Sequence, residues 1–266
     1  RTLNPMFLKG KTALVTGSTS GIGAACAAAL AQEGANLVIN GFGEAAAIAA
    51  QCSALAAASG ARAIHSPADL SDPAAVESLA GLALAEFGRV DILVNNAGIQ
   101  HVCPIEEFPP EKWRQMQAIM VDAPFLLCRA LVPGMKAAGW GRIISTASAH
   151  GSVASPNKSS YIAAKHAVVG LMRALGVELA LSGITANAIS PGYVWTPLVE
   201  NQIPDTMRTR NMTRDQVIND VLLAAIPQKR FVVPEQVGAM AVFLCSDSAS
   251  AITGANLAVD GGWTAQ

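Results

Sequence analysis

Short runs of β-forming residues recur along the chain and alternate with stretches of helical periodicity. The expected strands are Thr12–Val15, Asn36–Asn40, Ala61–His65, Val90–Asn95, Gly141–Ser145, Ile184–Ile189 and Asn256–Val259. Such an alternation specifies a mostly parallel sheet with helices on both faces. With 266 residues, one core is enough. We therefore expect a single doubly wound α/β domain over residues 9–266, with a seven-stranded sheet and an N-terminal extension over residues 1–8.

The composition argues against several classes of partner. The formal net charge is −1, without clusters of Lys or Arg, so nothing indicates binding to nucleic acid or to an anionic membrane. The uncharged stretch Ala45–Ala61 contains polar residues and resembles an amphipathic helix more than a membrane span. The five cysteines form no C-x-x-C pair, which indicates neither a disulfide framework nor a zinc site. We expect reduced thiols, no metal and a cytoplasmic location.

A glycine-rich turn follows the first strand directly. It runs from Thr16 to Gly23 in the spacing G-x-x-x-G-x-G and leads into the helical run Ala24–Gln32. Glycines at such a turn let the backbone approach a pyrophosphate that rests on the helix N-terminus. The turn predicts a dinucleotide site at the carboxyl end of the sheet, although a tight structural turn gives the same pattern.

The residues after the second strand bear on the choice of dinucleotide. Asn40-Gly41-Phe42-Gly43 offers no acid for the ribose hydroxyls and no cation for a 2′-phosphate. This pattern favours NAD over NADP. Phe42 either packs on the adenine or closes the turn. Asp69, followed by Leu70, either reaches the adenine edge or caps a helix.

A candidate catalytic set lies in the second half of the chain. Tyr161 and Lys165 are four residues apart in the helical run Tyr161–Leu181 and so share one helix face. A phenol needs a nearby cation to lower its pKa before it shuttles a proton at neutral pH. Ser148 is suited to hydrogen-bond a substrate oxygen. The chain has only two tyrosines, and one stands in register with the serine and the lysine.

Four motifs in this order resemble the short-chain dehydrogenase/reductase family, which has a Rossmann-type fold. They are the glycine turn, Asn95-Asn96-Ala97-Gly98, Ser148 with Tyr161-x-x-x-Lys165, and Pro191-Gly192-x-Val194-x-Thr196. The resemblance implies Tyr161 as general acid/base, Lys165 on the nicotinamide ribose, Ser148 on the substrate, and a homotetramer. The implied cofactor site comprises Gly17, Thr19, Gly21, Ile22, Gly23, Phe42, Asp69, Leu70, Asn95, Ala97, Gly98, Tyr161, Lys165, Pro191, Gly192, Val194 and Thr196.

Within that family, further motifs resemble those of bacterial D-3-hydroxybutyrate dehydrogenases. They are Asn40-Gly41-Phe42-Gly43, Gly98-Ile99-Gln100-His101, Ala147-Ser148-Ala149-His150-Gly151, Asn157-Lys158-Ser159 and Gly261-Gly262-Trp263-Thr264. This resemblance implies a pocket that holds a substrate carboxylate, and charged or polar donors suit that anion. The implied substrate-binding residues are Gln100, Ser148, His150, Lys158, Tyr161, Tyr193, Gln202 and Trp263. Taken singly, His150, Lys158, Gln100 and Gln202 are better explained as ordinary loop or surface residues. Taken together around one Ser/Tyr centre, they favour substrate binding.

The chain departs from these patterns at two places. Met120 stands where the family usually has an Asn that helps to hold a water beside the catalytic lysine, and a thioether cannot donate to that water. Tyr193 and Trp195 replace Trp and Arg of the narrower group, which changes the pocket. Helical patterning from Gln202 to Ile226 suggests a lid over the substrate.

The expected function is reversible NAD-dependent oxidation of a short 3-hydroxy acid, 3-hydroxybutyrate to acetoacetate, as in ketone body metabolism. One alternative is a 3-oxoacyl thioester reductase, which would use NADPH and a basic surface. Another is a catalytically impaired NAD-binding protein, suggested by Met120.

Overall fold

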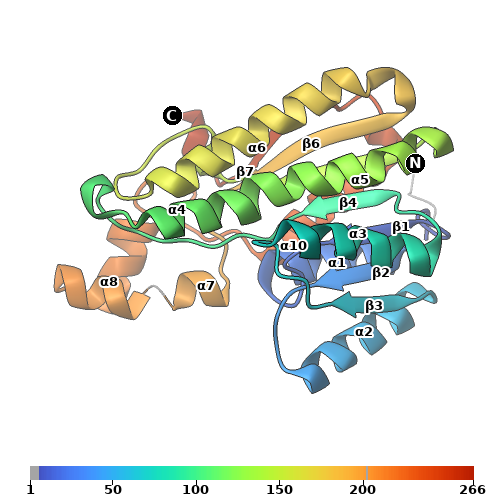
Figure 1. The fold of residues 1–266 in the computed structure, drawn as a ribbon. Coiled ribbons are helices and arrows are strands. Elements are labelled where there is room, and N and C mark those ends of the chain that lie inside the picture. The colour runs from blue at the N-terminus through green and yellow to red at the C-terminus, as the bar shows by residue number, and fades with distance from the viewer. Residues whose placement is uncertain (1–5, 202) are drawn as a thin grey trace.

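The computed structural model describes residues 6–201 and 203–266. Seven parallel strands form one sheet in the order β3-β2-β1-β4-β5-β6-β7 (Figure 1). The strands are β1 (Thr12–Val15), β2 (Asn36–Asn40), β3 (Ala63–Ser66), β4 (Ile92–Asn95), β5 (Gly141–Thr146), β6 (Ile184–Pro191) and β7 (Asn256–Val259). The expected fold class is confirmed, and β1, β2 and β7 have the expected bounds.

The α-helices are α1 (Gly21–Gln32), α2 (Ala45–Ser59), α3 (Pro73–Phe87), α4 (Pro110–Gln117), α5 (Ala123–Ala138), α6 (Ser159–Glu178), α7 (Pro197–Glu200), α8 (Ile203–Arg210), α9 (Arg214–Gln216) and α10 (Pro234–Cys245). Two π-helical segments are η2 (Ala118–Asp122) and η5 (Val217–Leu222). Short 3-10 turns are η1 (Ile105–Glu107), η3 (Ala149–Gly151), η4 (Ala180–Ser182), η6 (Asp247–Ala249) and η7 (Trp263–Ala265).

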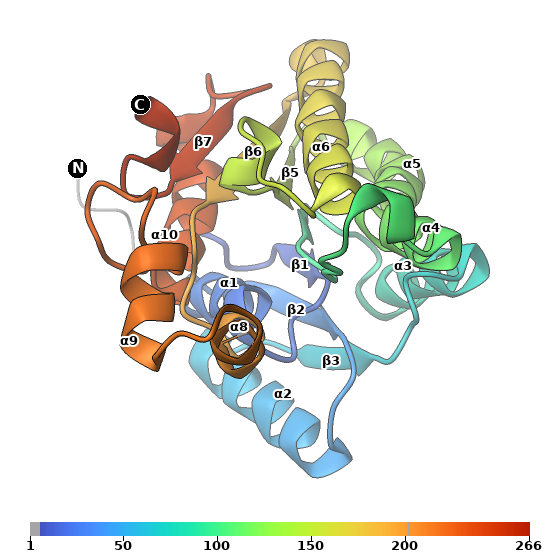
Figure 2. The ribbon, with the colours of Figure 1, turned by 90° about the vertical axis from the view of Figure 1, so that its left-hand side faces the viewer.

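Both faces of the sheet are buried under helices. Leu14 of β1 contributes to the core beneath α3, α5 and α6, whereas its neighbours Ala13 and Val15 contribute to the core beneath α1, α2 and α10. This alternation follows from the two-residue period of a strand. It explains why the central strands β1 and β4 carry apolar side chains on both faces, since helices lie on both faces of the sheet (Figure 2).

The start of the fold lies earlier than the sequence suggested. Leu8, which we expected to lie in an extension, is buried, and Phe7 packs against the same core. The backbone N–H of Leu8 also donates to the carbonyl of Glu33 at the end of α1. Glu33, directly after α1, therefore binds the backbone of Leu8, although the sequence around Leu8 shows no strand or helix pattern.

One continuous helical stretch, Pro110–Ala138, is long and apolar enough by length and composition to cross a bilayer. A core helix passes the same test. Here Leu127, Leu131 and Met135 are buried in the core on the sheet. The apolar face of this stretch is accounted for by packing within the domain.

The segment from α7 to η5 carries an apolar cluster of its own. Val199, Ile203, Val217 and Leu222 are buried there, beside partly buried Tyr193. Figure 1 shows α7 and α8 on the side toward which the strands point. The expected helical segment thus covers the carboxyl edge of the sheet, the edge where ligands bind in folds of this type.

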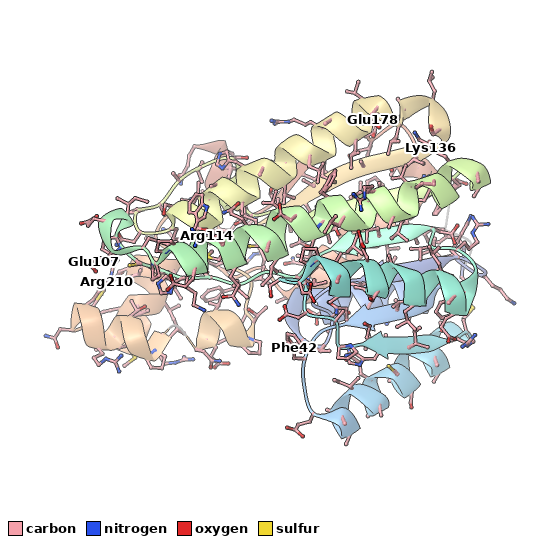
Figure 3. The ribbon with its side chains drawn as sticks, in the orientation of Figure 1. Phe42, Glu107, Arg114, Lys136, Glu178 and Arg210 are labelled. Carbon is pink, nitrogen blue, oxygen red and sulfur yellow. The ribbon has the colours of Figure 1, made fainter. Side chains whose placement is uncertain are left out.

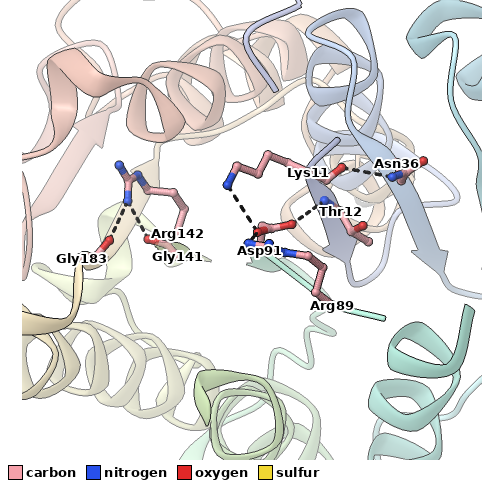
Figure 4. A network of polar contacts seen from close by, with 8 residues as sticks. All are labelled: Lys11, Thr12, Asn36, Arg89, Asp91, Gly141, Arg142 and Gly183. Atoms are coloured by element: carbon pink, nitrogen blue, oxygen red, sulfur yellow. Dashed lines mark hydrogen bonds and ion pairs between the residues drawn. The ribbon is translucent and has the colours of Figure 1, made fainter. Parts of the chain in front are cut away.

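A buried carboxylate joins the amino-terminal ends of the parallel strands β1 and β4, at the edge of the sheet away from the carboxyl ends (Figure 4). Asp91, just before β4, accepts a hydrogen bond from the Thr12 backbone N–H at 2.9 Å and forms ion pairs with Lys11 and Arg89. Its side chain is 1% exposed, whereas Lys11 reaches solvent. Because the Thr12 N–H is buried as well, the carboxylate satisfies a donor that water cannot reach.

We predict that Asp91→Ala lowers the free energy of unfolding by about 1–3 kcal/mol, because it leaves the buried Thr12 N–H without a partner. Denaturant unfolding measures this change. The matched control is Glu77→Ala, which removes an ion pair with Arg129 whose side chains are both more than half exposed. The control should cost less than about 1 kcal/mol. Equal losses in the two variants would contradict the proposed role of Asp91.

Candidate functional site

A cleft of about 460 Å³ runs along the carboxyl ends of the central strands. Its lining comes from the last residues of β2, β5 and β6, from the loops that follow β1 to β6, and from α1, η2, α6 and α7. The described lining residues are Gly17, Thr19, Ser20, Gly21, Ile22, Asn40, Gly41, Phe42, Ala68, Asp69, Leu70, Asn96, Ala97, Gly98, Ile99, Ile119, Thr146, Ala147, Ser148, Tyr161, Lys165, Pro191, Gly192, Val194, Thr196 and Pro197.

The glycine turn of β1–α1 packs directly against the end of β4. A Cβ on Gly17 would lie 2.8 Å from the Ala97 Cα, and Gly17 has a φ of +59°. Thr16 Oγ1 accepts hydrogen bonds from the backbone N–H groups of Asn96 and Ala97. The turn is therefore compatible only with glycine at position 17, as the sequence motif required.

The third glycine of the motif has a structural role. A Cβ on Gly23 would lie 2.3 Å from the Gly17 carbonyl oxygen and 2.5 Å from Asn96 Nδ2. Gly23, which we expected in the cofactor site, does not line the cleft. It supports the site by allowing the turn to pack closely. Asn95 does not line the cleft either, because it is buried and its amide donates to Ser145 Oγ on β5 at 3.4 Å.

The residues of the cleft fit a dinucleotide. Helix α1 begins at Gly21, and the Ser20 side chain at its N-cap forms no capping hydrogen bond. The first N–H groups of a helix lack partners within the helix and favour an anion such as a pyrophosphate. Gly17 packs directly against Ala97, and this contact holds the turn next to that position. Gly17, Ser20, Gly21 and Ile22 would hold such a group.

Asn40 holds the second strand to its neighbours. Its Nδ2 donates to the carbonyls of Ser66 and Ala68, at 3.1 and 2.9 Å, and its Oδ1 accepts from the Gly17 N–H at 3.4 Å. The buried amide thus supports the cleft from below. Phe42, in the loop after β2, is 68% exposed at the rim (Figure 3).

The two interpretations of Asp69 are resolved in part by the structure. Asp72, and not Asp69, caps α3 by accepting from the Ala74 N–H. Asp69 lines the cleft, and its Oδ1 accepts from both the N–H and the hydroxyl of Ser71. These hydrogen bonds lower the pKa of the Asp69 carboxyl, so it is an anion at neutral pH.

Ser148, Tyr161 and Lys165 converge at the centre of the cleft. Tyr161 and Lys165 lie one turn apart on α6, with the Lys165 Nζ 5.5 Å from the centroid of the Tyr161 ring. The Lys165 ammonium donates to the Thr146 carbonyl at 2.7 Å, and Ser148 Oγ accepts from the His150 N–H at 3.1 Å. Strand β5 thus positions two members of the set. Its last residue, Thr146, accepts the hydrogen bond from Lys165, and the turn after it carries Ser148.

Burial sets the protonation of this cluster. Burial raises the pKa of the Tyr161 phenol, and its hydrogen bond with Ser148 opposes that rise. Burial lowers the pKa of Lys165 to about 8, so the ammonium remains mostly charged at neutral pH. A cation beside a phenol favours the phenolate, which is what a proton shuttle needs.

Met120 lies beside this lysine. It is buried in η2, within a small cluster with Met116 and Ala164. A Cβ on Gly98 would lie 3.3 Å from the Met120 sulfur and 3.9 Å from the Lys165 Nζ. The thioether and the ammonium therefore flank the same glycine, so an apolar side chain fills the position next to the cation.

A second cavity of about 100 Å³ adjoins the first at Ser148 and Tyr161. Its described lining brings together seven of the eight expected substrate-binding residues; the eighth, Gln202, lies outside the described residues. The lining consists of Ile22, Gln100, Ser148, His150, Lys158, Tyr161, Gly192, Tyr193, Val194, Thr196, Val199 and Trp263.

Aromatic rings shape one side of this cavity. Tyr193 stacks on Trp263 with the ring centroids 5.4 Å apart and the planes at 10°. The His150 ring meets Trp263 edge-on at 5.1 Å, and His150 Nε2 is 2.8 Å from Ser155 Oγ. Burial, and then the Lys158 charge, lower the pKa of His150 to about 4, so its imidazole is neutral at pH 7.

The sequence analysis missed several residues of the cleft. Ser20, Asn96, Ile119 and Thr146 line it without having been assigned. Asn96 and Ser20 stand inside motifs that had been recognised, so the motifs contained the signal. Ile119 lies on η2, and nothing in its local pattern distinguishes it from a core residue.

Comparisons with known proteins agree with this geometry. A family model described as enoyl-(acyl carrier protein) reductase matches residues 17–264. The D-beta-hydroxybutyrate dehydrogenase of Rhizobium meliloti (strain 1021) is 50% identical over 256 residues, covering 96% of this chain and 99% of the relative. The enzyme of the same name from Cupriavidus necator is 49% identical over 260 residues, covering 98% and 100%.

Solved structures share the fold over the whole chain. The L-sorbose reductase of Gluconobacter frateurii, complexed with NADPH and L-sorbose, has a TM-score of 0.92 at 32% identity and covers 99% of this chain and 100% of its own. Levodione reductase has a TM-score of 0.87 at 34% identity, covering 97% and 98%.

We predict that acid destabilises the protein through His150. Its pKa is lowered from 6.5 to about 4 in the folded state, so between these values the unfolded chain binds more protons. The stability that His150 contributes is complete above pH 6.5 and is lost as the pH falls toward 4. Unfolding curves at several pH values should show a loss of about 3 kcal/mol in the free energy of unfolding that is absent in His150→Asn. An unchanged loss in that variant would contradict the assignment.

Proposed function

The chain belongs to the short-chain dehydrogenase/reductase family, and from this premise we propose that it is a dehydrogenase that oxidises 3-hydroxybutyrate to acetoacetate with NAD. The observation that carries the proposal is the pairing of two adjoining cavities. One is lined by Ser148, Tyr161 and Lys165, and the other places Lys158 and polar side chains beside that set. A short hydroxy acid needs both features.

Tyr161 is the general acid/base of this proposal. A bound nicotinamide dinucleotide supplies the acceptor for the hydride that leaves the substrate carbon with its electron pair. Tyr161 Oη receives the hydroxyl proton, Ser148 Oγ hydrogen-bonds the same substrate oxygen, and the Lys165 ammonium stabilises the phenolate. Ser148 and Lys165 are buried and Tyr161 is partly buried, which limits the competition of bulk water for these hydrogen bonds.

Lys158 is the proposed anchor of the substrate carboxylate. It lies three residues before Tyr161 and lines the second cavity together with Gln100 and His150. Because His150 is neutral at pH 7, Lys158 supplies the positive charge there. The sequence resemblance also implies Gln202 as a carboxylate ligand, and this residue lies outside those that the structure describes. A charged donor opposite the substrate supports an acid over a simple ketone or alcohol.

The proposed cofactor is NAD. Among the described residues that line the cleft, Lys165 is the one lysine or arginine, and it lies at the catalytic set. The loop of Gly41 and Phe42 therefore presents no cation to a 2′-phosphate. Phe42, Asp69 and Leu70 line the same end of the cleft, where they would contact the adenosine. The L-sorbose reductase was solved with NADPH, so the fold by itself does not decide between the two cofactors, and the choice rests on the residues of this loop.

The two alternatives receive less support. A thioester reductase would require a cation for NADPH near Phe42, and the described lining contains none there. A catalytically impaired protein was suggested by Met120, but the Ser148, Tyr161 and Lys165 side chains are brought together beside it.

We also propose a homotetramer in the cytoplasm, acting in ketone body metabolism. The family resemblance supports the assembly. Partly exposed aromatic side chains on the outer helices, Trp113 on α4, Phe125 on α5 and Phe243 on α10, are compatible with contacts between copies.

The direct test is NAD reduction by the purified protein with each enantiomer of 3-hydroxybutyrate. We expect turnover with one enantiomer and at least about tenfold lower kcat/KM with NADP, because a 2′-phosphate brings about two negative charges to a site without a cation. Turnover of neither enantiomer would overturn the proposed substrate. Equal efficiency with NADP would overturn the proposed cofactor preference.

Lys158→Ala tests the carboxylate anchor. The loss of one charge-assisted hydrogen bond should raise KM for 3-hydroxybutyrate by about ten- to a hundredfold, while KM for NAD changes little. The control substrate is 2-butanol, which has no carboxylate and should be used poorly by both proteins to the same extent. If the variant loses activity on the alcohol as well, Lys158 has a structural role instead.

A further inference from the structure

Both tyrosines of the chain line the 100 Å³ cavity, and only one of them is needed for proton transfer. The second, Tyr193, lies in the loop between β6 and α7. It is close enough to Tyr161 to contribute to the rise in the pKa of that phenol. Its position next to the reacting group suggests a role in binding the substrate.

The ring of Tyr193 is held in a fixed orientation. One face stacks on Trp263 at 5.4 Å, and the Tyr193 carbonyl accepts a hydrogen bond from the Val232 N–H at 2.9 Å. A ring packed in this way places its hydroxyl at a defined point of the cavity. The stacking also means that the hydroxyl is not needed to hold the ring in place.

The Tyr193 hydroxyl is hydrogen-bonded to Lys158, with a Nζ–Oη distance of 3.3 Å. An ammonium has three N–H donors and no acceptor, so the phenol oxygen must accept this bond. The phenol hydrogen is then free to donate to another group. Among the residues that the structure describes, no carboxylate forms an ion pair with Lys158.

We propose that the Tyr193 hydroxyl is a second donor to the substrate carboxylate, acting together with Lys158, and that it makes the site selective for free acids over their esters and thioesters. Two donors on adjacent residues of one cavity match the two oxygens of a carboxylate. An ester has neither the charge nor the second strong acceptor, so it leaves the O–H donor poorly matched. This inference rests on the proposed function and deepens it.

The kinetic test is Tyr193→Phe, which removes only the hydroxyl and keeps the ring on Trp263. Activity is measured with 3-hydroxybutyrate and with methyl 3-hydroxybutyrate, which has the same carbon skeleton without the charge. The variant should raise KM for the acid by about ten- to a hundredfold and leave KM for the ester within about twofold. The preference for the acid then narrows by the same factor. An equal change for both substrates, or no change for the acid, would overturn the proposal.

A binding test needs no turnover, so it decides the proposal even if 3-hydroxybutyrate is not oxidised. Protein labelled with [13Cζ]-tyrosine should give two NMR signals, because the chain has two tyrosines, and the spectrum of Tyr161→Phe assigns them. In the presence of NAD, butyrate should shift the Tyr193 signal saturably. Butyramide, its neutral analogue, should not do so.

The same titration with Lys158→Met separates the two donors. Removal of the ammonium should weaken the butyrate-dependent shift by at least about tenfold, since the charge carries much of the affinity. A Tyr193 signal that does not respond to butyrate in the unaltered protein would overturn the proposal. So would a signal that responds equally to butyramide.

Discussion

The contact on which the site depends is the packing of the β1–α1 turn against the end of β4. Gly17 and Ala97 approach so closely that a Cβ on Gly17 would lie 2.8 Å from the Ala97 Cα, and Thr16 Oγ1 closes the contact with two backbone N–H groups. The start of α1 therefore lies at the bottom of a 460 Å³ cleft. The catalytic set lines the same cleft from β5 and α6, so one edge of the sheet carries both halves of the site.

Burial is the physical cause that links the ionisable groups of the site. It lowers the pKa of Lys165 to about 8 and that of His150 to about 4, and it raises the pKa of Tyr161. The consequences differ by residue. Lys165 keeps its charge at neutral pH and supports a phenolate, whereas His150 stays neutral and leaves Lys158 as the cation of the adjoining cavity. Burial thus gives the neighbouring side chains of Lys165, His150 and Tyr161 different protonation properties.

Much of this arrangement follows from local sequence. The strands were recognisable because both faces of the sheet are covered, which favours short runs of β-forming apolar residues, and the glycine turn was recognisable because close packing excludes any Cβ. The errors have equally local causes. Leu8 belongs to the core although it precedes the first strand, and Asp72 caps α3 where Asp69 also fitted the pattern. Gly23 and Asn95 belong to recognised motifs, but their roles are to support the cleft and not to line it.

The sequence by itself determined the fold class, the family and the candidate catalytic set, because periodicity, glycine spacing and the i, i+4 pair of Tyr161 and Lys165 are properties of the chain over short distances. Only the tertiary structure decided which of the other side chains meet. Tyr193 and Lys158 are 35 residues apart, and Trp263 is further still, yet they meet in one cavity. The reason is that parallel strands bring the loops after their carboxyl ends to one edge, and the local pattern of a loop does not record which loop lies opposite.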